Sequence, residues 1–411
     1  MEHSMKKKLH FFISSIFILS YLAACQPMIT PTPKTTLPDT ASPTALLPAT
    51  ATSILEPTAT ATSKPPTATP MADYPPEGYG PKDFPAGINP LTGLKVSDPN
   101  LLERRPIVIK VQNLPRADRP QWGLSNADIV YEYYTEMGTT RFAAVFYGED
   151  AEMVAPIRSA RLFDFNVIRA YKAMFIFGSA YELTYNRLVN SEFASRLMLE
   201  SANTADVITR YEPNTNNFEA ADTSKVAAYT QRMGIDNSKQ NLDGMFFQLQ
   251  APDGGEKSES VFVRFSGAIY NRWDYNPTTK AYARFSDVQN SYSAADEVYE
   301  QLLDRANDKP IEAENVAIVF VRHTDIDGRA NVEVIDVSLL GTGTAYVARD
   351  GKVYKVTWSR PSEDAVLTFL NEDGTPFPLH PGQTWVEILT LSGTTAVQDD
   401  GNYRFTLVSE W

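Results

Sequence analysis

The sequence has little cysteine and little histidine, with one Cys and four His among 411 residues. A single cysteine excludes an internal disulfide scaffold, because each bridge needs two thiols. His3 and His10 lie within the first 24 residues, which leaves His323 and His380 in the remainder. Metal sites built from several histidines are therefore excluded. Because the motifs of nucleotide-binding loops, zinc proteases and serine hydrolases are also missing, we expect no metal and no cofactor.

Basic residues are scarce as well: 37 Lys and Arg stand against 50 Asp and Glu, which gives a net charge of −13. Removing residues 1–24 takes away one acid and three bases, so the net charge of the remainder is −15. Proteins that bind nucleic acid need a basic surface to neutralise phosphates. We therefore expect no nucleic-acid partner.

Long hydrophobic runs are absent except near the N-terminus, where Lys6, Lys7 and Lys8 precede apolar residues 11–19. This run is too short to span a membrane and predicts a signal peptide over residues 1–24. Leu22-Ala23-Ala24-Cys25 is typical of a bacterial lipoprotein processing site, so we expect Cys25 to carry the lipid that anchors the protein. The alternative is an ordinary signal peptide followed by a chance cysteine. The lipid anchor predicts a cell-membrane protein on the extracytoplasmic side.

Residues 25–75 are predicted to form a disordered tether. Of the 46 residues from 26 to 71, 23 are Thr or Pro. Such a composition has too little apolar surface to offset the entropy of the chain, and proline favours extended, solvated conformations. The tether is expected to hold the folded part away from the membrane.

The folded part is predicted to be α+β, with a mixed α/β N-terminal domain over 85–235 and a mainly antiparallel β domain over 256–411. In the first domain, β-branched and aromatic residues predict strands, and apolar residues at helical spacing predict a helix from Ala160 to Tyr171 with Ser159 as its N-cap. A second helix is expected over 181–199. The predicted strands of this domain cover residues 106–111, 127–134, 141–147 and 173–177.

The polar stretch 214–255 is predicted to be a boundary or a long surface excursion. Beyond it, runs of alternating residues separated by Asp-Gly turns predict a series of strands, interrupted by one helix over 294–305. The predicted strands cover residues 261–265, 268–275, 282–285, 316–321, 330–337, 343–347, 353–358, 384–390 and 403–408.

Several segments resemble a known family. They are 89–93 (Asn-Pro-Leu-Thr-Gly), 117–124, 127–132, 140–142, 156–161 (Pro-Ile-Arg-Ser-Ala-Arg), 272–275, 315–321, 341–343 and 381–386. Together they resemble the YerB-type lipoprotein family, whose N- and C-terminal parts are catalogued as domains of unknown function. The resemblance implies a two-part extracytoplasmic protein tethered to a membrane. Where the family often has a His and two glycines before a Ser, this chain has Phe-Ile-Phe-Gly-Ser over 175–179.

Arg158-Ser159-Ala160-Arg161 is the strongest candidate for a binding site. Two guanidinium groups beside a helix N-terminus favour an anion, and Arg141 is a possible third contact. Envelope polymers offer phosphodiesters and carboxylates as ligands. The alternative is that these arginines pair with acids such as Asp128, Glu132 or Glu136.

Asp128, Glu132 and Glu136 recur every four residues, so on a strand their side chains are expected to share one face. Paired carboxyl groups can perform acid–base chemistry on a glycosidic bond. The alternative is that they are solvated or paired with arginine.

Trp273 and Tyr275 lie on a predicted hairpin and are candidates for an aromatic platform that stacks on sugars, with core packing as the alternative. Asp325-Ile326-Asp327-Gly328 resembles part of a calcium loop but lacks an acid at its first position, so we interpret it as a turn.

The sequence favours a membrane-anchored extracytoplasmic lipoprotein of the cell envelope that binds or assembles an anionic wall component or an envelope protein. One alternative is a hydrolase or transferase acting on wall glycan or phosphodiester. Another is the substrate-binding lipoprotein of a transporter, although that class has βα units in both lobes.

Overall fold

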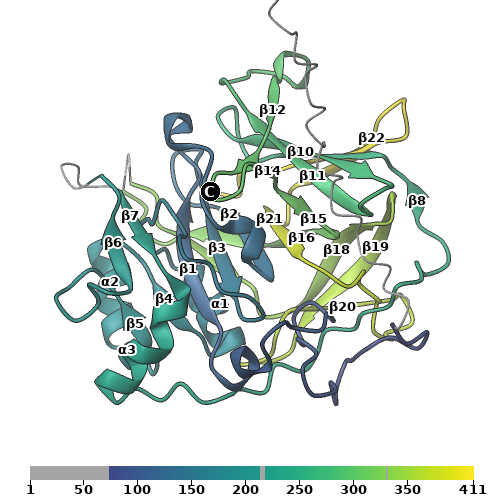
Figure 1. Cartoon of the computed structure of the whole chain (residues 1–411). Helices are drawn as coiled ribbons and strands as arrows, with labels where there is room; N and C mark the ends of the chain where they lie inside the picture. The colour runs from purple at the N-terminus through teal and green to yellow at the C-terminus, as the bar shows by residue number, and fades with distance from the viewer. Residues whose placement is uncertain (1–73, 213–217, 330–331) are drawn as a thin grey trace, which may run out of the picture. The chain divides into compact units, whose positions relative to one another are not determined.

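Strands dominate the fold, as Figure 1 shows. The longer strands are rich in β-branched and aromatic residues. The computed structural model describes residues 74–212, 218–329 and 332–411. The predicted signal peptide, Cys25 and all but the last two residues of the predicted tether lie outside this part. The α+β class is confirmed, because all three α-helices of the described residues lie before residue 234, whereas strands continue to residue 406.

Twelve strands of the described residues form one sheet, in the order β20-β19-β18-β16-β21-β2-β3-β1-β4-β5, with β17 paired to β16 and β8 paired to β19. Their bounds are β1 Ile107–Gln112, β2 Ile129–Tyr134, β3 Thr140–Phe146, β4 Met174–Ile176, β5 Leu197–Met198, β8 Glu256–Lys257, β16 Asn315–Asp325, β17 Ile335–Ser338, β18 Gly341–Arg349, β19 Lys352–Arg360, β20 Thr368–Leu370 and β21 Thr384–Thr390.

The centre of this sheet joins the two halves of the chain. β21 lies between β2 and β16 and runs parallel to both, with Glu132 opposite Glu387 in the pairing with β2. Every residue of β2 and β21 is buried. Parallel strands covered on both faces are expected to be continuously apolar, so carboxyl groups at Glu132 and Glu387 stand out.

Seven described strands form a second sheet, in the order β12-β11-β10-β9-β23-β22 with β15 paired to β11. Two short ribbons, β6-β7 and β13-β14, complete the strands. The bounds in the second sheet are β9 Ser260–Arg264, β10 Tyr270–Asn276, β11 Ala281–Asp287, β12 Tyr299–Gln301, β15 Glu312–Ala313, β22 Thr394–Val397 and β23 Tyr403–Thr406. Those of the ribbons are β6 Ile208–Arg210, β7 Glu219–Ala221, β13 Leu303–Asp304 and β14 Lys309–Pro310.

The two sheets pack through aromatic residues. The rings of Trp273 on β10 and Trp385 on β21 lie 5.1 Å apart, and those of Tyr346 and Phe405 also lie 5.1 Å apart. Large aromatic side chains remove much apolar area from water, at about 25 cal/mol per Å². The predicted N- and C-terminal domains therefore describe segments along the chain, whereas the core is shared between them.

The helices are α1 Asp164–Tyr171, α2 Glu182–Val189 and α3 Val226–Met233. None of the described helices is long and apolar enough to cross a membrane. The predicted start of the first helix at Ala160 is wrong, and Ser159 is not its N-cap. The backbone of residues 158–160 is extended, because Arg158 N donates to Lys110 O and Ala160 N donates to Ser179 O. Helix α2 likewise ends ten residues before the predicted position.

The helix predicted over residues 294–305 is wrong. These residues form a 3₁₀ turn, Ala294–Asp296, followed by β12 and β13, because pairing with β11 overrides the helical pattern. Helix α3 is an addition that the sequence did not predict, and it lies inside the stretch 214–255, predicted to be a boundary or a long surface excursion. It ends at Gly234, whose left-handed backbone (φ 66°) lets its N–H bond back to the last turn.

Candidate functional site

The segment predicted to bind anions is an extended strap, residues 157–160, held between β1 and the loop after β4. Ile157 bridges to Val111, and Ala160 bridges to Ala180. The N–H of Gly178 donates to Arg158 O at 3.0 Å. The strap therefore places Arg158 and Ser159 against Gly178 and Ser179, rather than at the N-terminus of α1.

Arg141 and Arg161 are occupied by one acid. Arg161 Nε donates to Glu136 Oε2 at 2.6 Å, and Arg141 Nη2 donates to Glu136 Oε1 at 3.2 Å. Burial acts to raise the pKa of Glu136, but the hydrogen bond from Arg161 and the two guanidinium charges outweigh it and hold the pKa below its usual value. These two arginines therefore have the ion-pair role of the alternative interpretation.

Arg158 differs from both. Its nearest acid is Asp118, with Nη2 and Oδ2 3.5 Å apart, and its guanidinium donates no hydrogen bond to any part of the chain that the structure describes. The side chain is only 17% exposed. Burial lowers the pKa of Arg158, the charge of Asp118 opposes that effect, and the group stays cationic at neutral pH.

Arg158 lines a cavity of about 370 Å³ together with Ser159, Ser179 and Glu219, which we call the Arg158 cavity. Ser159 Oγ and Ser179 Oγ lie 2.7 Å apart. The full lining comprises Ile157, Arg158, Ser159, Gly178, Ser179, Leu199, Glu200, Arg210 and Glu219. The lining thus combines two cations, two acids and two hydroxyl groups.

The acids of the Arg158 cavity pair with Arg210. Arg210 Nε donates to Glu200 Oε1 at 2.7 Å, and Arg210 Nη2 donates to Glu219 Oε1 at 2.9 Å. Burial raises the pKa of Glu219, although the charge of Arg210 opposes it. Gly178 lies directly against this carboxyl group, since a Cβ there would come within 2.8 Å of Glu219 Oε2.

The three predicted carboxylates occupy three separate environments, so the prediction that they share one face is wrong. Alternation holds only along a strand, and β2 contains Glu132 alone, while Asp128 precedes it and Glu136 lies in the turn after it.

Asp128 lines a second cavity, of about 470 Å³, which we call the carboxyl cavity; Glu314, Asn89 and Gln383 also line it. Burial raises the pKa of Asp128 to about 7, against hydrogen bonds from Gly148 N at 3.0 Å and Asn89 Nδ2 at 2.7 Å. Burial also raises the pKa of Glu314 to about 7, and its Oε2 accepts from Gln383 N at 2.6 Å. Two carboxyl groups that titrate near neutrality therefore line the carboxyl cavity.

Glu132 is fully buried in the core between the two sheets. It accepts from Arg284 Nη2 at 2.6 Å, and Arg284 Nη1 lies 3.2 Å from Glu387 Oε1. Burial and the charge of Glu132 raise the pKa of Glu387 to about 8. Because Arg284, Glu132 and Glu387 are all at most 1% exposed, this cluster is part of the core.

The aromatic platform is also corrected. Trp273 is completely buried, and its Nε1 donates to Glu387 Oε1 at 2.9 Å. Tyr275 is half-buried, with its ring 5.1 Å from that of Tyr282. The indole packs in the core because an inward-facing strand position buries its large apolar surface, so it offers no face to a sugar.

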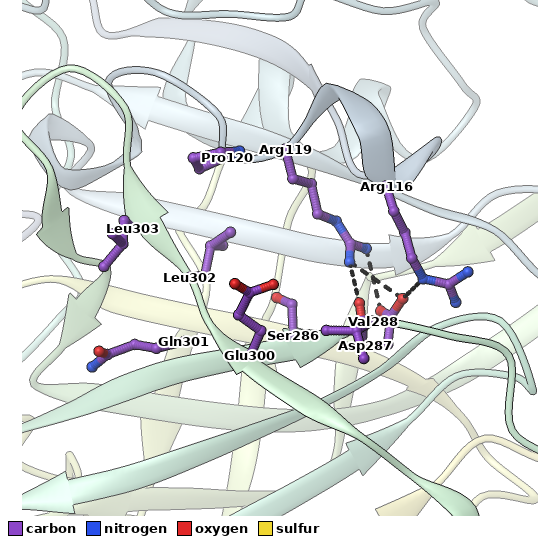
Figure 2. Close-up of a pocket in the computed structure, with 10 residues that line it drawn as sticks. All are labelled: Arg116, Arg119, Pro120, Ser286, Asp287, Val288, Glu300, Gln301, Leu302 and Leu303. Atoms are coloured by element: carbon purple, nitrogen blue, oxygen red, sulfur yellow. Dashed lines mark hydrogen bonds and ion pairs between the residues drawn. The ribbon is translucent and has the colours of Figure 1, made fainter. Parts of the chain in front are cut away.

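A further pocket, of about 350 Å³, lies where the loop after β1 meets β11 and β12. Figure 2 shows Arg116 and Arg119 both directed at Asp287, with Arg116 Nε 2.5 Å from Asp287 Oδ2. Arg119 also donates to Asp287 O at 2.8 Å and to Asn113 O at 2.8 Å. Because these donors are occupied, the two arginines fasten the loop to the second sheet.

Sequence reasoning missed Ser179, Arg210, Glu219 and Glu314 as cavity residues. One signal was available, because Gly178 and Ser179 stand where the chain departs from the pattern of the family that it resembles. Arg210, Glu219 and Glu314 lie in segments with no motif, and only the fold brings them to their cavities.

Comparison with known proteins agrees with this fold. Residues 91–236 match the family described as "Protein of unknown function (DUF3048) N-terminal domain", and residues 261–386 match its C-terminal domain. "Putative lipoprotein YerB" of Bacillus subtilis (strain 168) is 30% identical over 313 residues, which cover 73% of this chain and 85% of that protein. The crystal structure of the YerB protein from Bacillus subtilis matches with a TM-score of 0.61 and 26% identity, covering 73% of this chain and 96% of that one. The chain therefore belongs to the YerB-type lipoprotein family, with its N- and C-terminal DUF3048 domains.

Proposed function

We propose that this lipoprotein is a binding module of the cell envelope, held on the extracytoplasmic side of the membrane by lipid on Cys25. Its ligand is an anionic group of a wall component or of an envelope protein, bound in the Arg158 cavity. The observation that carries the proposal is the guanidinium of Arg158, which lines a cavity while donating no hydrogen bond to the described protein.

The chemistry of this guanidinium supports an anionic ligand. Arginine has five N–H donors in a planar fork that matches the two oxygens of a carboxylate or phosphate. Charge-assisted hydrogen bonds of this kind are roughly twice as strong as neutral ones. The hydroxyl groups of Ser159 and Ser179 bond to each other at 2.7 Å, and each can rotate to donate to an anion instead.

The charge of the whole protein sharpens this argument. A chain with a net charge of −15 beyond residue 24 repels anionic polymers at long range. Recognition of an anion therefore has to come from a local site that presents a cation at short distance, and Arg158 provides that cation.

The proposal is tested with the mature lipoprotein, residues 25–411, in detergent and with isolated cell walls. Walls that keep their anionic polymers should retain the protein, and walls stripped of them should not. Arg158→Gln should reduce retention about tenfold. Arg272→Gln is the matched control, because Arg272 is also partly buried and pairs with Asp274 at 2.8 Å on β10. Equal retention of the two variants would reject the Arg158 cavity as the binding site.

A second candidate function is acid–base catalysis in the carboxyl cavity, as a hydrolase or transferase of wall glycan. It is favoured by Asp128 and Glu314, whose pKa values near 7 suit one group to donate a proton and the other to accept one. Incubation with wall glycan should then release fragments detectable by mass spectrometry. Asp128→Asn and Glu314→Gln should each abolish the release. If the unaltered protein releases no fragments, the catalytic function is rejected and the binding function is the one that remains.

A further inference from the structure

We propose that the ligand of the Arg158 cavity is a zwitterion: an amino acid or the end of a short peptide, whose carboxylate meets Arg158 and whose ammonium meets Glu219. This inference rests on the proposed function and names the chemical class of the ligand. The proposed ligand carries a cationic group in addition to the anionic group that binds Arg158.

The first argument is the charge of the cavity. The lining residues Arg158, Arg210, Glu200 and Glu219 carry equal numbers of positive and negative charges. Asp118, which does not line the cavity, adds a negative charge 3.5 Å from Arg158. A zwitterion places one charge of each sign in the cavity and leaves the net charge of the site unchanged, whereas an anion alone adds negative charge where desolvation is costly.

The second argument is the position of Glu219. The residue is 7% exposed, and its Oε1 is taken by Arg210 at 2.9 Å. Its Oε2 lies over Gly178, within 2.8 Å of where a Cβ would stand. Because residue 178 has no side chain, the space in front of this oxygen stays open toward the cavity.

The third argument is that the residues proposed to bind the two charges of the ligand, Arg158 and Glu219, both lie next to Gly178. The main chain of Arg158 is fixed to this segment, because Gly178 N donates to Arg158 O at 3.0 Å. A Cβ on Gly178 would lie 2.8 Å from Glu219 Oε2 and 3.8 Å from the carbonyl carbon of Arg158, so both residues border Gly178 at the cavity. A volume of about 370 Å³ falls in the range of small-molecule sites, and it suits a ligand whose two charges are a few bonds apart.

The test uses the mature lipoprotein in detergent and three probes measured by calorimetry: alanyl-alanine, its N-acetyl form and its C-terminal amide. The zwitterion should bind at least tenfold more tightly than either capped form.

Variants assign each end of the probe. Arg158→Gln should weaken the zwitterion and the N-acetyl form about equally. Glu219→Gln should weaken the zwitterion at least tenfold and leave the N-acetyl form unchanged. Gly178→Ala should also weaken the zwitterion, because its methyl group would crowd Glu219 Oε2. Glu192→Gln is the control, since Glu192 pairs with Arg169 outside the cavity.

The outcomes separate the two proposals. If the N-acetyl form binds as tightly as the zwitterion and Arg158→Gln weakens both, the zwitterion is rejected while the anion-binding function stands. If none of the three probes binds, and inorganic phosphate and isolated walls also fail to bind, both proposals are overturned.

Discussion

At the scale of single residues, one cluster in the core contains two acidic residues and one basic residue. Glu132 and Glu387 lie side by side on β2 and β21 and share one guanidinium, that of Arg284. All three side chains are excluded from water, so two carboxylates and one guanidinium would leave a net negative charge in the core. Such a charge is costly, and the cluster avoids it by keeping a proton on Glu387.

This retained proton predicts a dependence of stability on pH. The pKa of Glu387 is about 8 in the folded protein and about 4.5 when the group is free in water. Between these values the folded state binds a proton that the unfolded state releases, so the free energy of unfolding falls as pH rises from about 4.5 to 8. One such proton changes the stability by up to about 1.4 kcal/mol per pH unit. Glu387→Gln should reduce that slope.

The measurement is urea unfolding of both proteins at pH 5.5, 7 and 8.5. The difference between the two slopes isolates Glu387, because other titrating groups act equally in both proteins. Parallel slopes would show that Glu387 ionises in the core.

At the scale of elements, strands follow from composition more reliably than helix ends do. The prediction for β21 has the observed bounds, Thr384–Thr390, and that for β2 starts only two residues early, because each is a continuous apolar or aromatic run between polar turns. The start of α1 depends on hydrogen bonds from the strap to residues 110 and 179, which no local pattern contains. The same limit applies to the site. Arg158 and Ser159 were predictable from one short motif, whereas Ser179 and Glu219 join them only through strand pairing.

The start of α1 also depends on Asp164, whose carboxylate has three partners. Its Oδ2 accepts from Arg161 N at 2.7 Å. Its Oδ1 accepts from Tyr133 Oη at 2.5 Å and lies 3.3 Å from Nζ of the fully buried Lys110. Asp164→Ala should lower the free energy of unfolding by about 3 to 5 kcal/mol, because it leaves a buried lysine without its partner. The check is urea unfolding at pH 7.

The double variant Lys110→Met with Asp164→Ala separates the ion pair from the two other hydrogen bonds. It removes the buried charge along with its partner, so much of the lost stability should return. The part that stays lost measures the hydrogen bonds of Asp164 with Arg161 N and Tyr133 Oη, about 1 kcal/mol each. A double variant as unstable as Asp164→Ala would show that these hydrogen bonds, rather than the ion pair, dominate.

At the scale of the whole molecule, the two family domains share one sheet, so the order of strands in that sheet couples their folding. Two family domains match separate segments, 91–236 and 261–386, yet β21 from the second segment lies between β2 of the first and β16. The Glu132–Arg284–Glu387 cluster likewise takes residues from both segments. Each half alone would expose an unpaired strand edge and part of a buried ionic cluster.

We therefore predict that the folded part unfolds as one unit. Calorimetry of residues 74–411 should give a single transition whose calorimetric and van't Hoff enthalpies agree. Residues 74–255 lack β21, so β2 would lose its partner on one side and its buried face would meet water. This fragment should show little near-ultraviolet circular dichroism and should bind a hydrophobic dye. Adding residues 256–411 should restore the native signal, since each half then regains its missing strand neighbours. Two separate transitions in the intact chain, or a fragment that folds cooperatively alone, would mean that the shared sheet is not what couples the halves.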